Sequence, residues 1–163
     1  MIKLKDIIKK LKVLADLHPN INYFGVGNIS DLTDDILTYP YMWINTDVTH
    51  TVNYTEDNGY RSIEFELGVR IGDKVNDEVN YDGIRGIGTT NELDVLSDTF
   101  NTLLDIINTI SEDSLDLFGG ILLIDDITVT PFFNEDTGDV TGNECTLIFK
   151  VKNDKICITP LNS

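Results

Sequence analysis

The chain has 163 residues, of which 41% are hydrophobic, a size that suits one domain with an ordinary core and excludes a disordered tail. Its longest apolar run, from Ile121 to Ile124, has four residues, which is far too short for a helix that crosses a bilayer. Its net charge is −16, and such a surface repels nucleic acid and anionic membranes, so it indicates either ordinary solubility or a position near DNA without binding.

The N-terminal segment predicts an amphipathic helix. Leu4, Ile7, Leu11 and Leu14 recur at three- and four-residue spacing, which places them on one face. Pro19 predicts the end of this helix at about His18. Lysines interrupt the apolar residues, so we expect no signal peptide and synthesis in a cytoplasm.

The lysines of this segment lie largely outside the apolar stripe. They are Lys5, Lys9, Lys10 and Lys12, and a fifth lysine, Lys3, precedes them. Residues 1–12 carry +4, which leaves −20 on the other 151 residues. A solvated face, contact with phosphate or an anionic membrane, and docking onto an acidic neighbouring copy are three interpretations, and salt would screen the last of these.

The next segments predict strands. Ile21 to Ile29 holds a short strand that Gly25 and Gly27 weaken, and β-forming residues follow Pro40. Apolar and polar residues alternate over 48–54 and again over 63–71. Between these two segments, residues 56–59 read Glu-Asp-Asn-Gly, a strong signal for a tight turn. We therefore expect a hairpin here.

Residues 73–91 predict a long polar loop, and a second amphipathic helix follows it. The loop is rich in glycine and carries four acidic residues, namely Asp73, Asp77, Glu78 and Asp82. In the helix, a narrow apolar seam is expected, with the cap at Thr90 or Asn91 and the end near Ser111. The seam residues are Leu93, Leu96, Phe100, Leu103, Ile107 and Ile110.

The C-terminal part predicts a second pair of strands. One runs from Ile121 to Thr130, and the other contains the alternating residues Cys145 to Val151. Residues 134–143 form a polar loop between them, with Glu135, Asp136 and Asp139. The order of elements predicts a single α+β domain over 1–163, an antiparallel sheet of hairpin strands with two amphipathic helices packed on one face.

No constellation of residues gives a coherent catalytic or metal site. Asp136-Thr137-Gly138 matches the aspartic-protease triplet, but turn chemistry explains it in a connection between strands. The glycines of 83–88 lack the spacing of a phosphate-binding loop, and the acidic residues of 73–91 lack that of a calcium loop. We expect no enzyme, no cofactor and no metal.

The four cysteine and histidine residues also favour plain interpretations. Cys145 and Cys157 indicate two free thiols in a reducing compartment, and two cysteines do not make a zinc site. His18 ends a helix and His50 lies in a strand, so a metal pair is a remote alternative, and two histidines do not suffice to assemble a catalytic triad with confidence.

Several segments resemble one class of viral proteins. They are the helix that ends at His18-Pro19, the Phe24 to Ile29 segment with its two glycines, Tyr39 to Ile44, Ile127 to Phe132, and the C-terminal tail with Cys157. Together they resemble phage head–tail connector proteins of the tail-terminator-like class, especially those of crAss-like and other Bacteroidetes phages. The likeness is a diffuse pattern that covers nearly the whole chain.

The resemblance implies a virion protein that forms a six- or twelve-fold ring at the neck or upper tail. Such a ring would join portal, connector or tail proteins and surround the DNA channel without binding DNA specifically or touching a membrane. The polar loops and the lysine-bearing helix are then candidates for the subunit interface or the lumen. The alternative is another intracellular protein–protein interaction module with a similar fold.

Overall fold

The computed structural model describes residues 2–33, 37–47, 49–54, 61–76, 91–113, 117–123, 126–133 and 140–153. The elements follow in the order α1 (Leu4–Leu17), β1 (Tyr23–Gly27), a 3₁₀ turn η1 (Ile29–Asp31), β2 (Tyr41–Asn45), β3 (His50–Tyr54), β4 (Arg61–Lys74), α2 (Glu92–Glu112), β5 (Ile121–Leu123), β6 (Val129–Phe133) and β7 (Val140–Asn153). The described part is therefore α+β, as the sequence predicts.

One mixed sheet contains the seven strands of the described residues. The long strands β4 and β7 pair antiparallel along their whole length at its centre. β2 and β3 lie one after the other along the outer side of β4, and β6 and β5 lie likewise along β7. β1 pairs parallel with β2, so the prediction of a purely antiparallel sheet is wrong at this one junction.

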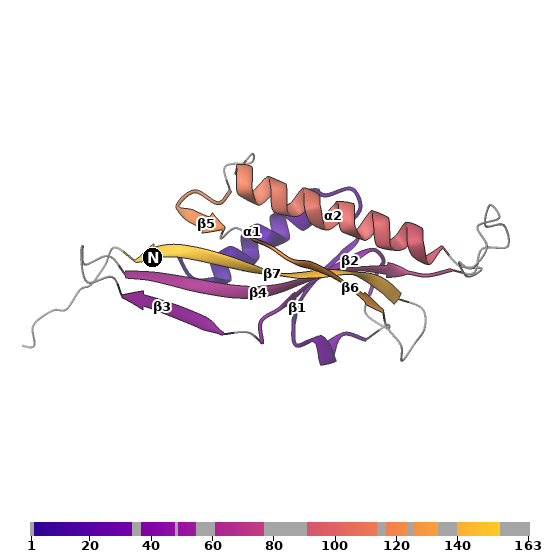
Figure 1. The fold of residues 1–163 in the computed structure, drawn as a ribbon, viewed down its shortest axis with the longest axis horizontal. Coiled ribbons are helices and arrows are strands. Elements are labelled where there is room, and N and C mark those ends of the chain that lie inside the picture. Colours follow the sequence, from indigo (N-terminus) through magenta and orange to yellow (C-terminus); the bar gives the residue numbers. More distant parts are fainter. Residues whose placement is uncertain are drawn as a thin grey trace, which may run out of the picture.

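Both helices pack on the same face of the sheet, which confirms the predicted layers (Figure 1). α1 buries Ile7, Leu11 and Leu14, and α2 buries Leu103 and Ile106 against that face. The alternate positions of the central strands point into the same core, because side chains of a strand alternate between its two faces. The main core thus lies between the sheet and the two helices.

A smaller apolar cluster lies on the opposite face of the sheet. Tyr41, Trp43 and Val140 are buried in it, and Phe132 packs against it. Trp43 lies over Gly25, where a Cβ atom would come within 2.4 Å of the indole ring. Gly25 is therefore needed for this close approach, and the glycine that weakens the strand prediction is part of the packing.

The antiparallel pairing of β3 with the first half of β4 confirms the two predicted hairpin strands, and the turn predicted at residues 56–59 lies outside the described residues. The strand predicted over residues 121–130 is wrong as one element. It is divided into β5 and the start of β6, which pair with different parts of β7. Periodicity along the chain cannot reveal this division, because both pieces carry the same strand-forming residues.

Both predicted loops are shorter than their sequence suggests. β4 continues through Asp73 to Lys74, so Asp73 belongs to a strand, and β7 begins at Val140, so residues 140–143 are strand as well. The polar residues at these strand ends are paired across the sheet, for example Asp73 with Thr141. Residues 77–90 and 134–139 lie outside the described part of the chain.

The buried face of α2 differs from the predicted seam. Val95, Thr99, Thr102 and Ile106 are buried although the seam omits them. Leu93 and Phe100, which belong to the seam, are each 42% exposed. The helix is thus rotated relative to the expectation, and its two buried threonines are polar positions that a search for apolar periodicity passes over.

Candidate functional site

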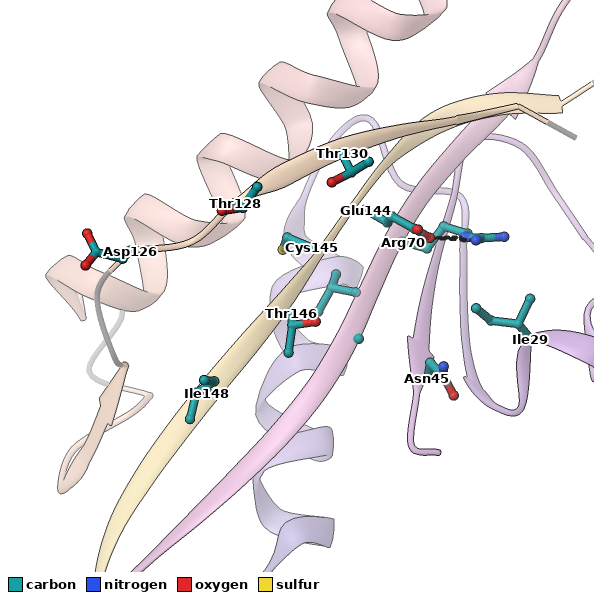
Figure 2. Close-up of a pocket in the computed structure, with 12 residues that line it drawn as sticks. Ile29, Asn45, Arg70, Asp126, Thr128, Thr130, Glu144, Cys145, Thr146 and Ile148 are labelled. Atoms are coloured by element: carbon teal, nitrogen blue, oxygen red, sulfur yellow. Dashed lines mark hydrogen bonds and ion pairs between the residues drawn. The ribbon is translucent and has the colours of Figure 1, made fainter. Parts of the chain in front are cut away.

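A groove of about 500 Å³ lies on the sheet around the middle of β4 and β7. Its lining comes from β2, β4, β6, β7 and η1, as Figure 2 shows for Asn45, Arg70, Thr130 and Thr146. Gly68 lies between Asn45 and Thr146 in the same row of the sheet. Since Gly68 has no side chain, the row is hollow at this point.

An ion pair crosses this groove from β4 to β7. Arg70 donates from Nε and Nη2 to Oε2 of Glu144, at 2.8 and 2.5 Å (Figure 2). The guanidinium carbon also lies 4.1 Å from the centre of the Phe132 ring, which is a favourable cation–π distance. Arg70 is thus held by two partners and its charge is locally neutralised.

Cys145 follows the groove residue Glu144 on β7, but its side chain belongs to the main core between the sheet and the helices. Burial, with a smaller contribution from the neighbouring Glu144 carboxylate, raises the pKa of the Cys145 thiol to about 12. The thiolate is the nucleophilic form of cysteine, and at neutral pH this thiol stays protonated. Cys145 therefore acts as a small apolar side chain, and Cys157 lies outside the described residues.

A second surface lies beside the edge strand β6. Leu93, Phe100 and Leu104 of α2 and Phe133 of β6 are between 40% and 51% exposed. Phe100, Leu93 and Pro131 border one shallow hollow between this helix and the strand. Clustered exposed apolar side chains are typical of interaction surfaces, and we name this set the α2–β6 apolar flank.

The four lysines of α1 have different environments. Lys5 and Lys9 are exposed and no described carboxylate pairs with either. Lys12 pairs with Asp16 at 2.8 Å on the same helix. Lys10 donates to the carbonyl of Leu117 and lies over the Phe118 ring, so it is an internal contact and not a free candidate for an interface.

Of the seven acidic candidates, the structure describes only Asp73. Asp73 lies on β4 and not in the predicted loop, and its side chain faces the first turns of α2. Burial raises the pKa of the Asp73 carboxyl, and so does the Asp98 carboxylate, although a hydrogen bond from the Lys74 N–H opposes them. The other six lie outside the described residues. They are Asp77, Glu78, Asp82, Glu135, Asp136 and Asp139.

The two histidines have separate partners. His18 Nε2 lies 3.7 Å from the Asp105 carboxylate of α2, and the His50 ring packs edge-on against Phe65. Among the described residues, no three His, Cys, Asp or Glu side chains come together in the manner of a metal site. No helix in this part of the chain is long and apolar enough to cross a membrane.

Two features of this region were not predicted from the sequence. Asn143 is buried and donates from Nδ2 to the Leu96 carbonyl at 2.8 Å and to Thr99 Oγ1 at 2.9 Å, which fixes α2 to the sheet. The Arg70–Glu144 pair joins residues 74 positions apart. Arg70 lies between the core residues Val69 and Ile71, so alternation places it on the helix-free face. Its partner is revealed only by the register of the strands.

Comparison with known families adds no relative to these observations. No protein-family model matches the chain, and no curated protein matches it.

Proposed function

We propose that this chain is a virion structural protein that forms a ring at the head–tail interface of a phage, at the neck or as a tail terminator. In this proposal six or twelve copies join the portal or connector to the tail and surround the DNA channel. The chain acts by assembly and not by catalysis. The tail-terminator-like character of the fold belongs to the same proposal and rests on the resemblance of the segments named above.

One observation carries the proposal: two opposite sides of the molecule expose apolar side chains, and only one of them also exposes lysines. The side formed by α2 and β6 exposes the α2–β6 apolar flank. The side formed by α1 and β1 also exposes apolar side chains, namely Val13, Leu17 and Val26, but it adds the exposed lysines Lys5 and Lys9. A surface of one kind that binds a surface of the other kind is a head-to-tail contact, and such contacts close into a ring when the rotation between copies divides a full turn.

The helix-free face of the sheet suits a channel wall. The long helices α1 and α2 cover only one face (Figure 1), and the other, on which Ile29 of η1 packs, carries polar side chains such as Arg70 and Glu144. Arg70 is already paired with Glu144, which reduces its attraction for phosphate. On the same face Lys150 is paired with Glu64, and the net charge of −16 on the whole chain disfavours the binding of DNA.

The direct test is the mass and shape of the full chain in solution. Light scattering behind size-exclusion chromatography, together with negative-stain electron microscopy, should give closed rings of uniform size as the concentration rises. A monomer at every concentration would overturn the proposal and favour the intracellular interaction module. Open fibres would retain the head-to-tail contact and overturn the ring.

A further inference from the structure

Five strands of the sheet form a band in a single register. Reading across β1, β2, β4, β7 and β6, one row contains Gly25, Trp43, Arg70, Glu144 and Thr130. The row before it, which starts at Phe24, and the row after it, which starts at Val26, also continue without a break from β1 to β6. The two outer strands of this five-strand band therefore lie at the same level, although about a hundred residues separate them in the chain.

The two outer strands also match in length and direction. β1 and β6 each have five residues. β1 runs parallel to β2, and each of the three junctions from β2 to β6 reverses the direction, so β1 and β6 are antiparallel. Within the described residues, no backbone hydrogen bond joins the outer side of either strand to another segment. Unpaired edges of this kind are templates for another strand.

We propose that β6 of one copy pairs antiparallel with β1 of the next copy, so that the five-strand bands join into one sheet around the ring. This inference rests on the proposed function and adds the contact that closes the ring. A rotation about an axis roughly parallel to the strands leaves their direction unchanged. It therefore brings β6 of one copy beside β1 of its neighbour in opposite directions, as antiparallel pairing requires.

The side chains of the two edges agree with this pairing. Phe24 and Val26 point to the helix face, in the same rows as Pro131 and Val129. Apolar side chains thus meet apolar ones on that face, and cross-strand pairs of this type stabilise a sheet. The register can shift between copies only by an even number of residues, because an odd shift would exchange the faces. In a closed barrel, the tilt of the strands requires a shift of this kind between neighbouring strands.

The helix layer extends the same contact. The α2–β6 apolar flank lies directly beside the β6 edge, and α1 lies over β1 at the opposite edge. When the edges pair, the α2 flank of one copy faces the α1 side of the next. The aliphatic stems of the exposed Lys5 and Lys9 can then cover Phe100 and keep their charges in water.

Pro131 gives the contact some selectivity. Proline has no N–H group, so β6 offers one donor fewer than its length allows. Proline on an edge strand is a common protection against pairing with unrelated strands. Backbone pairing alone is then weak, and the apolar flank supplies the additional affinity, which favours a second copy over any exposed strand.

Disulfide scanning tests the pairing in the full chain. In a Cys157→Ser background, Val26→Cys is combined in turn with Val129→Cys, Pro131→Cys or Phe133→Cys, which share its face. Thr130→Cys and Phe132→Cys, on the other face, are the matched controls. Under mild oxidation the first series should give a ladder of covalent oligomers up to the full ring, and the controls should give at least tenfold less linked product.

Hydrogen exchange on the unsubstituted chain gives an independent measurement that does not depend on the folding of any variant. On assembly, alternate amides of β1 should become protected, because only every second N–H of a strand points outwards. A ring that forms without this protection, and without a difference between the two cysteine series, overturns the paired edges but leaves the ring intact. A chain that never assembles overturns the proposed function itself.

Discussion

Phe100 offers the sharpest test of the α2–β6 apolar flank. Its side chain is 42% exposed in the isolated chain, so of the roughly 200 Å² that a phenylalanine can bury, about 80 Å² remains open to a neighbour. At about 25 cal/mol per Å², covering this area contributes about 2 kcal/mol to each contact between copies. Phe100→Ala should therefore weaken association about 30-fold, since 1.4 kcal/mol corresponds to a factor of ten.

The same substitution also removes packing within the chain, so it needs a matched control. Phe65→Ala is suitable, because Phe65 is likewise a partly buried phenylalanine that packs against the core, but it lies beside β3 and away from both proposed edges. Both variants should lower the melting temperature. Only Phe100→Ala should shift the association curve in sedimentation equilibrium at a temperature where both are folded. Equal association constants for the two variants would refute the role of the flank.

Three further predictions concern charge and anchoring. Asp73→Asn should raise the melting temperature at pH 7, because the raised pKa of Asp73 means that its ionised form is disfavoured in the folded state. This gain in melting temperature should disappear as the pH falls through that pKa towards the ordinary value of about 3.9. A gain that persists at pH 3 would contradict this cause. Asn143→Ala should cost about 2 kcal/mol in urea unfolding, since it removes two buried hydrogen bonds, and an unchanged midpoint would argue against the anchor. Lys5→Glu with Lys9→Glu makes the net charge of −16 more negative by four units and should weaken assembly at low salt, with partial recovery at high salt; assembly that is indifferent to both changes would remove α1 from the contact.

Local pattern was sufficient for the elements that have a strong period of their own. The stripe of α1 with its end at Pro19, and the alternation that becomes the central part of β4, predict the observed elements closely. These segments face one core on one side, so burial follows directly from spacing. The layers of the fold follow too, because two amphipathic helices and a sheet have few ways to cover each other.

Long-range pairing was beyond the reach of local pattern. The parallel junction of β1 with β2, the division of residues 121–130 between two strands, and the Arg70–Glu144 pair all depend on which segments meet in space. The orientation of α2 depends on Asn143, a polar residue that no apolar period includes. The rotation that buries Thr99 is also what leaves Phe100 available to a neighbour.

The most direct measurement of the central proposal is a cryo-electron microscopy reconstruction of the assembled full-length chain. A closed ring is expected, with the backbone density of β6 in one copy continuing as a paired strand into β1 of the next. Single copies that carry both edges uncovered at every concentration would contradict the assembly of this chain into a virion ring.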